Sequence, residues 1–403
     1  MKTYLSKETF EKASVVWLIL SSGSVFYSKI NMFLCVAIMV FLSAVFILRF
    51  HNGVIGRQNI LTAGLVLGYG LLTCLANRFR GFSLNNFLIL AGELLFLATV
   101  TSFITARRFQ EIFVTTMYVM AAISLVCFAF VLVFPNVSLP FEMSNSRVNW
   151  TGTFYYTLGF YGRRSFRNAG VFGEGGVYQI FLNLALFYLL QSDAPIKQKK
   201  RKGFALILAI LTTISSMGYI VMVFVIMSLL VKNKVSRNRY YLFCFLCILA
   251  IIVVDSSTGL LSEKILNKGG SFGSRYDDII VSIETANEKP LLGHGMTCDN
   301  TEAWEAHVES PRRMTNPRYV TLQRSSGIGI ALMRCGYPFL VIYLFAMYSY
   351  FKRSINRGRI INLIGTLILV LGLVNEPAQF TSIFLLSFFN WRTADKEEKI
   401  RNV

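Results

Sequence analysis

The sequence is short of charge, and of acid and histidine in particular. Of its 403 residues only 15% are charged, whereas soluble domains carry about 25%, and 54% are hydrophobic. A soluble chain of this length could not bury so much apolar side chain, so lipid must be the solvent for much of the protein. The composition therefore excludes an ordinary soluble enzyme and indicates an integral membrane protein.

Acidic residues are outnumbered by basic ones. The chain holds 21 acidic and 40 basic residues, which gives a formal net charge of +19. In a soluble protein such an excess is typical of nucleic-acid binding. In a membrane protein the simpler cause is that loops facing the cytoplasm are rich in Lys and Arg. We therefore expect no nucleic-acid partner.

Motifs for disulfides, metals and nucleotides are also missing. All of the 7 cysteines except Cys298 lie in or beside apolar runs, so a disulfide framework is not expected. The sequence has no HExxH, no clustered Cys and His ligands, and no P-loop or GxGxxG on a soluble unit. We expect neither a metal nor a cofactor.

Long apolar runs are what the sequence has instead. Runs of a length to cross a membrane fall at 13–28, 31–48, 60–76, 85–105, 112–134, 171–190, 240–255 and 326–350. We read the first as a span that starts translocation and not as a cleaved signal peptide, because no small-residue cleavage site follows it.

Two further apolar runs, 203–231 and 360–390, carry basic residues on both flanks. A single crossing would place one basic flank outside, whereas a hairpin keeps both in the cytoplasm. The first run can turn at 215–218 (Ser-Ser-Met-Gly) and the second at 375–377 (Asn-Glu-Pro). We therefore predict an all-α polytopic membrane protein of about twelve transmembrane helices. Both termini would be cytoplasmic, and 1–403 would form a single integral membrane domain.

The basic run 197–202 fixes the expected orientation. It follows the span 171–190 and marks the cytoplasm, so the segment before that span is expected outside. Two sizeable exterior loops result, 135–170 and 256–325. The second is expected to contain an amphipathic helix at about 274–287. Its apolar face would lie on the membrane surface or pack on the bundle.

Arginine is concentrated in these exterior loops. The first loop ends in GRRSFRNAGVFGEGG (162–176), which contains Arg163, Arg164 and Arg167, and the second contains Arg275 and Arg324. Arginine is preferred over lysine where a planar fork must hold phosphate or carboxylate. These side chains either form an anion site or extend to exterior lipid headgroups. Arg275, in the first turn of the expected helix, is well placed for a phosphate, because helix N-termini attract anions.

Three other residues are candidates for acid–base chemistry. Glu174 is expected about one turn into a span, where an acid is costly and is paired, faces a cavity or is functional. It forms a salt bridge with Arg167 or acts as a general base. His294 and His307 are expected outside, and either could serve as a base near neutral pH or simply be solvated.

Three stretches, in order, resemble the bacterial O-antigen polymerase and O-antigen ligase superfamily. RNAGVFGE (Arg167–Glu174) is similar to that family's Arg-x-x-Gly-x-Phe-x-Glu-Pro stretch entering a span. LTTISSMG (211–218) is similar to its Thr-x-Ser hairpin, and Arg275 followed by PLLGHG (290–295) to its Arg…Pro-x-x-Gly-x-Gly segment. The family often has Pro after the Glu, where this chain has Gly175.

The resemblance implies metal-independent glycosyl transfer at the outer face of the bacterial cytoplasmic membrane. Donor and acceptor would be glycans on undecaprenyl pyrophosphate, and the product an O-antigen, capsular or exopolysaccharide. Other partners would be membrane lipid and a chain-length regulator. Arg167 and Arg275, with Arg163, Arg164 and Arg324, would bind pyrophosphate, and Glu174, His294 or His307 would be the base.

The alternatives are ligation of the glycan to lipid A core and transport of lipid-linked oligosaccharide by a flippase. Ligases tend to carry a histidine close before the span after the large loop. Residues 311–326 of this chain contain none, and His307 lies further upstream. This departure favours a polymerase.

Overall fold

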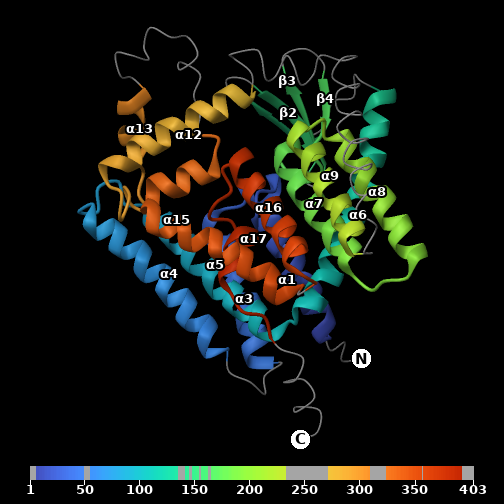
Figure 1. Cartoon of the computed structure of the whole chain (residues 1–403), viewed down its shortest axis with the longest axis horizontal. Coiled ribbons are helices and arrows are strands. Elements are labelled where there is room, and N and C mark those ends of the chain that lie inside the picture. The colour runs from blue at the N-terminus through green and yellow to red at the C-terminus, as the bar shows by residue number, and fades with distance from the viewer. Residues whose placement is uncertain are drawn as a thin grey trace, which may run out of the picture.

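The computed structural model describes residues 6–49, 55–134, 141–144, 148–153, 156–161, 165–232, 271–308, 324–355 and 357–392. Figure 1 shows a bundle of helices with a small sheet and two helices at one end of it. The helices are α1 (Lys7–Ser21), α2 (Val25–Lys29), α3 (Met32–Arg49), α4 (Arg57–Ala76), α5 (Leu84–Phe103), α6 (Ala106–Val133), α7 (Gly175–Gln191), α8 (Ile196–Thr212), α9 (Ser216–Lys232), α12 (Ser271–Glu288), α13 (Thr301–Val308), α15 (Gly327–Ser354), α16 (Arg359–Asn375) and α17 (Ser382–Leu385).

Five of these helices are long and apolar enough to cross a membrane: α3, α4, α5, α6 and α15. Three shorter helices, α7, α9 and α16, are also apolar. The predicted class of helical membrane protein is therefore supported. The count of about twelve spans stays a prediction, and the predicted span 240–255 lies outside the described residues.

The first predicted span, 13–28, is broken. α1 ends at Ser21 and α2 begins at Val25, because Gly23 between them adopts φ +117°. The chain can adopt this backbone conformation only where no Cβ is present or where strain is accepted.

The two predicted hairpins differ in the structure. In the first, α8 and α9 are two helices of 17 residues that meet next to the predicted turn. In the second, only the outgoing leg is a long helix, α16. The return leg contains the four residues of α17 and a 3₁₀ turn over Leu386–Phe388. Irregular backbone at membrane depth is tolerated only inside protein, and this leg is largely buried.

A four-stranded antiparallel sheet follows α6 and was not predicted. Its strands β1 (Phe141–Ser144), β2 (Val148–Thr153), β3 (Tyr156–Tyr161) and β4 (Ser165–Asn168) pair in chain order. Segment 148–161 is rich in Val, Trp, Thr, Tyr and Phe, the residues that favour strands. The sheet ends in β4, which leads directly to α7.

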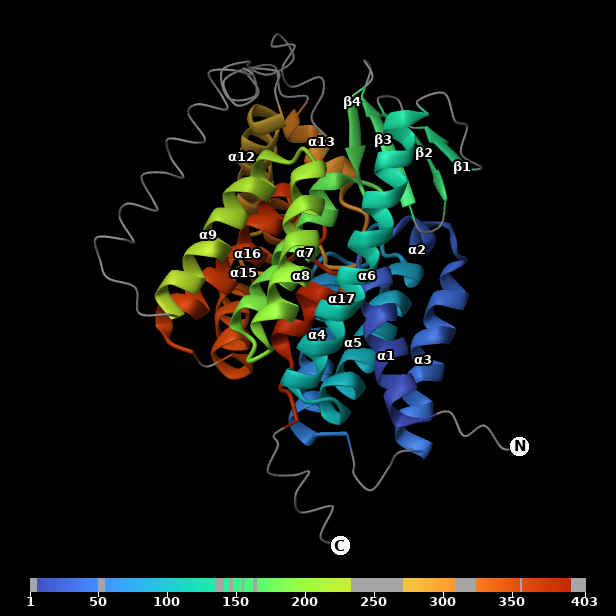
Figure 2. The same cartoon turned by 90° about the vertical axis from the view of Figure 1, so that its right-hand side faces the viewer.

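The sheet, α12 and α13 lie at the same end of the bundle (Figure 2). The start of α1 and the last described residues lie at the other end, where Arg392 N donates to Thr101 O over 2.8 Å. The two predicted exterior loops are thus neighbours in space. That their end faces the exterior stays a prediction.

α12 covers the predicted segment and packs on α15 through polar as well as apolar side chains. Asp277, Asp278 and Ser282 are buried against the bundle beside α15, whereas Tyr276 is 57% exposed. Ile279, Ile280 and Ile283 of the predicted apolar stripe are partly buried, and contact of α12 with the membrane surface stays a prediction.

Candidate functional site

The N-terminus of α7 is built to let other groups approach closely. Glu174 occupies the N-cap position, so it precedes the helix and does not lie one turn inside a span as expected. The first two helical residues are Gly175 and Gly176. A Cβ on Gly176 would collide with Glu376 Oε1, and one on Gly175 would lie 2.9 Å from Thr213 O. Both glycines are required by close contacts.

Glu376, the C-cap residue of α16, fills the space above these glycines. It is 3% exposed, and its side chain is in hydrogen-bond contact with that of Glu174. Asn375 Nδ2 donates to Glu376 Oε1 over 2.6 Å. Burial raises the pKa of the Glu376 carboxyl, the neighbouring Glu174 carboxyl raises it further, and the Arg275 charge opposes this rise.

Arg275 reaches this carboxyl pair from α12. Its Nε donates to Asn375 O over 2.9 Å, and its Nη2 lies 3.7 Å from Glu376 Oε1. The guanidinium thus binds a terminal carbonyl of α16, where the helix dipole favours a cation. The side chain stays 23% exposed, so part of the fork faces outward.

Asp278 fixes the position of Arg275 one turn further along α12. Its Oδ2 accepts hydrogen bonds from the Ser325 N over 2.9 Å and from the Ser325 hydroxyl. These contacts tie α12 to the segment that enters α15. Burial raises the pKa of the Asp278 carboxyl, and the Ser325 hydrogen bonds and the Arg275 charge oppose this rise.

Arg167 approaches from the sheet. It pairs with Gly159 in the β3–β4 ladder, and its guanidinium is close enough to the Tyr219 hydroxyl for their charges to interact. The next residue, Asn168, is buried. Its Nδ2 donates to Thr212 Oγ1 over 2.9 Å, and its carbonyl would lie 3.4 Å from a Cβ on Gly175. Arg167 is therefore held beside the start of α7.

We name Arg167, Glu174, Arg275, Asn375 and Glu376 the carboxyl–arginine cluster. It joins the sheet, α7, α12 and α16 at the end of the bundle where the predicted exterior loops lie. It combines guanidinium groups, which bind phosphate oxygens, with a carboxyl pair able to accept and release a proton.

The two candidate histidines lie at the other end of α12. α12 has 18 residues, so Glu288 at its last position is roughly 20 Å from Arg275 at 1.5 Å per residue. His294 Nε2 lies 3.5 Å from Glu288 Oε2, and His307 Nε2 lies 3.0 Å from Glu288 Oε1. We name these three residues the histidine cluster. The structure does not bring it together with the carboxyl–arginine cluster.

His294 is held as a neutral scaffold residue. It is 7% exposed, and its Nε2 lies 2.9 Å from Thr285 O, which requires a proton on that nitrogen. Burial lowers the pKa of His294, while the Thr285 carbonyl and the Glu288 carboxylate oppose this fall.

Arg324 belongs to neither cluster. Arg324 donates from Nη2 to Thr301 Oγ1 over 2.8 Å and lies 5.9 Å from the centre of the Trp304 ring, so it holds α13. Arg163 and Arg164 lie outside the described residues.

The PLLGHG stretch (290–295) has a visible structural role. α15 is interrupted at Gly336, which adopts φ +76°, and this break frees backbone groups of the helix. His294 N donates to Met333 O over 2.9 Å, and Gly295 N donates to Arg334 O over 3.0 Å. The stretch thus satisfies carbonyls that the broken helix leaves open.

The same stretch fits the break closely. Tyr337 N donates to Pro290 O over 2.9 Å. Gly293 adopts φ +62°, and a Cβ there would collide with the backbone of Arg334. The glycines of this motif are therefore explained by packing alone.

Sequence reasoning missed Glu376 and Asn375 as site residues. The signal was present, because an acid next to the end of an apolar helix is costly and needs a partner or a function. What the sequence did not show was the contact with Glu174, which joins segments far apart in the chain.

Within the described ranges, no group of three His, Cys, Asp or Glu side chains could hold a metal ion. The expectation of metal-independent chemistry stays a prediction.

Comparison with known proteins gives one family match. Residues 203–322 match the family model described as O-antigen ligase. No curated protein matches the chain. The matched segment includes Arg275 and the histidine cluster, whereas Arg167, Glu174 and Glu376 lie outside it. The match confirms, over this segment, the resemblance to the O-antigen polymerase and O-antigen ligase superfamily that the sequence motifs predict.

Proposed function

We propose that the protein is a glycosyltransferase that polymerises lipid-pyrophosphate-linked oligosaccharide repeat units at the outer face of the cytoplasmic membrane. The observation that carries the proposal is the carboxyl–arginine cluster. Two carboxyl groups in contact, Glu174 and Glu376, lie beside Arg275, whose side chain is partly exposed. The family match over residues 203–322 supports the reaction class.

In the proposed reaction an acceptor hydroxyl attacks the anomeric carbon of the donor glycan. The bond from that carbon to the pyrophosphate oxygen breaks, and the electron pair leaves with the pyrophosphate. Arg275 and Arg167 stabilise the negative charge that develops there, in a place already organised to receive it. The ionised member of the Glu174–Glu376 pair accepts the proton of the hydroxyl.

A ligase would break the same bond with a different acceptor. The description of the matched family names this activity, and it is the second candidate. The polymerase is favoured because 311–326 contains no histidine, and His307 is held by Glu288 at the end of α12 away from Arg275.

The decisive experiment is to analyse lipid-linked glycans in a strain that lacks the protein. Accumulation of single lipid-linked repeats supports a polymerase. Accumulation of long lipid-linked polymer identifies a ligase, and loss of repeats from the exterior identifies a flippase. The last two outcomes contradict the proposal.

A matched pair of arginine variants tests the site itself. Arg275→Lys keeps the charge but loses the planar fork, so long-chain polymer should fall at least tenfold. Arg80→Lys changes an exposed arginine at the same end of the bundle and should leave the chain-length ladder unchanged. A wild-type ladder in Arg275→Lys and in Arg275→Ala, at equal protein levels, would remove Arg275 from the site.

A further inference from the structure

A large cavity runs along α6, from the first turns of that helix to Phe26 and Val171 near the segment that enters α7. Its volume is about 1090 Å³, and it is bounded by α1, α6, the end of α7 and the start of α8. This volume is at the upper end of the range for small-molecule sites. We name it the lipid groove for the reasons that follow.

The lining of the lipid groove has two zones. Along α1 and α6 it is apolar, with Val16, Leu20, Val119 and Met120, and it extends to Phe26 of α2. Since α6 is one of the helices long enough to cross a membrane, this zone follows the direction of the lipid chains.

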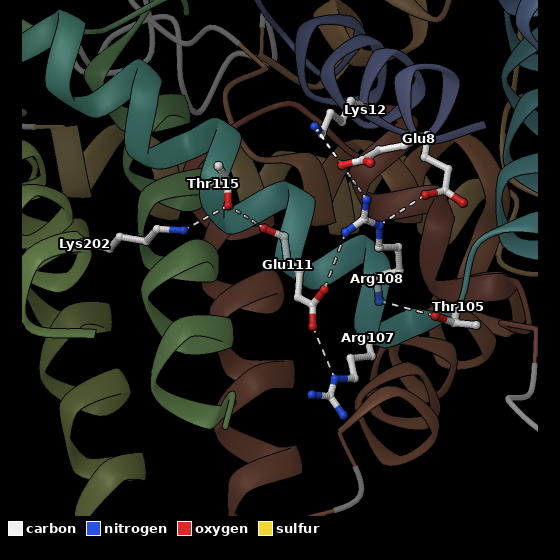
Figure 3. A network of polar contacts seen from close by, with 9 residues as sticks. Glu8, Lys12, Thr105, Arg107, Arg108, Glu111, Thr115 and Lys202 are labelled. Atoms are coloured by element: carbon white, nitrogen blue, oxygen red, sulfur yellow. Dashed lines mark hydrogen bonds and ion pairs between the residues drawn. The ribbon is translucent and has the colours of Figure 1, made fainter. Parts of the chain in front are cut away.

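The other zone is polar and carries an excess of positive charge. The cations Lys12, Arg107, Arg108, Lys202 and Arg357 line it, against the carboxylates Glu111 and Asp193. Figure 3 shows the network that connects most of these groups along the first turns of α6.

Most of these cations already have carboxylate partners. Arg108 lies 3.1 Å from both Glu8 and Glu11, and Arg107 lies 3.3 Å from Glu111. Arg357 pairs with Asp193 over 2.5 Å. These pairs fix the walls of the polar zone.

Lys202 differs from the others. It is 7% exposed, and its Nζ donates to Thr115 Oγ1 over 3.0 Å and lies 6.0 Å from the centre of the Tyr118 ring. Among the described residues it has no carboxylate within ion-pair distance. A buried ammonium is costly unless its charge is compensated. Its two remaining N–H donors call for an anion in the groove.

We propose that the lipid groove binds an anionic phospholipid, with the phosphate against Lys202 and an acyl chain along Val16, Leu20 and Val119. The ammonium of Lys202, the one lining cation without a carboxylate partner among the described residues, fits an anionic headgroup, and the apolar zone fits its chain. Basic pockets between transmembrane helices bind anionic headgroups in this way. The polar zone, at the first turns of α6, lies at the end of the bundle away from the carboxyl–arginine cluster, so lipid binding there does not require the proposed glycosyl transfer.

The test is a lipid titration of the purified full-length protein in detergent, followed by native mass spectrometry. Phosphatidylglycerol should bind at least tenfold more tightly than phosphatidylcholine with the same chains. Lys202→Met keeps the stem and removes the charge, so it should abolish this preference, and Lys202→Arg should restore it. The matched control is Lys200→Met, which changes an exposed lysine of the same helix and should behave as wild type.

A second variant tests the apolar zone and does not depend on the folding of Lys202→Met. Val119 is 48% exposed on the groove wall, so Val119→Trp should fold and should weaken phosphatidylglycerol binding by obstructing the chain. Three results would overturn the proposal: equal affinity for both lipids, an unchanged preference in Lys202→Met and Val119→Trp, or displacement of phosphatidylglycerol by a lower concentration of polyprenyl phosphate.

Discussion

The two ends of α12 hold their polar side chains in different ways. At the first end, Arg275 reaches a carbonyl and a carboxylate of the 375–376 turn, and two carboxyl groups are in contact. At the last end, backbone hydrogen bonds dock the 290–295 stretch into a broken helix, and His294 binds a carbonyl of its own neighbourhood. The first end of α12 therefore brings several ionisable side chains into contact, whereas at the last end the polar groups form hydrogen bonds that hold the backbone in place.

This difference distinguishes a candidate catalytic site from residues with a structural role. Placing one carboxyl against another in a buried position raises the free energy of the folded protein. Such costs are typical of functional sites. The histidine cluster has no comparable cost, because Glu288 is half-exposed and lies within reach of both histidines. We therefore assign the chemistry to the carboxyl–arginine cluster.

The largest expected effect comes from removing the ionisable carboxyl of Glu376. Glu376→Gln keeps the shape but leaves the pair without a second ionisable group, so the polymerisation rate should fall about 100-fold, the scale of general base catalysis. The matched control is Glu288→Gln at the other end of α12, which should change the rate less than about threefold. The measurement is chain-length analysis of the polymer in cells that express each variant at equal levels.

The opposite ranking of these two variants would contradict the assignment of the chemistry to the carboxyl–arginine cluster. If Glu288→Gln abolished polymer and Glu376→Gln did not, the base would belong to the histidine cluster.

A smaller effect, on stability and not on chemistry, is expected at the docking stretch. Gly293→Ala places a Cβ at φ +62° and against the backbone of Arg334, so the free energy of unfolding should fall by about 1–3 kcal/mol. Gly64→Ala is the control, because nothing lies within 4 Å of a Cβ there and alanine favours the helix. Thermal unfolding in detergent measures both. Equal stability of the two variants would show that the stretch is not a structural element.

The sequence predicted the helices better than it predicted the site. Apolar runs and basic flanks located α3 to α6, α15 and the α8–α9 hairpin, because lipid imposes length and composition directly on each segment. The β strands were missed because an apolar pattern search passes over short strands in a loop. Arg167, Glu174 and Arg275 were selected by residue type and by resemblance. Glu376 was not, because only the fold brings the end of α16 to the start of α7.

The Pro-x-x-Gly-x-Gly motif shows a second limit of predicting the site from the sequence. It was read as part of a functional segment, and His294 within it as a candidate base. In the structure its glycines allow close packing against the interrupted helix α15, and the His294 amide donates a hydrogen bond to a carbonyl of that helix. A pattern shared with a family does not separate residues kept for packing from residues kept for chemistry, since both demand particular residue types.

The smallest expected effect is the pH dependence that His294 gives to stability. Burial lowers its pKa in the folded protein below the ordinary value of 6.5, against the pull of Thr285 and Glu288 and with the help of Lys289 and His307. The folded state thus favours the neutral ring, and below about pH 6.5 the unfolded chain binds the proton more readily. The stability from His294 is complete above this value and is lost as pH falls through the folded pKa. The melting temperature of the wild type should therefore fall more between pH 7 and pH 5 than that of His294→Gln. A steeper fall in the variant would mean that the folded state prefers the charged ring, and the histidine end of α12 would no longer count as neutral scaffold.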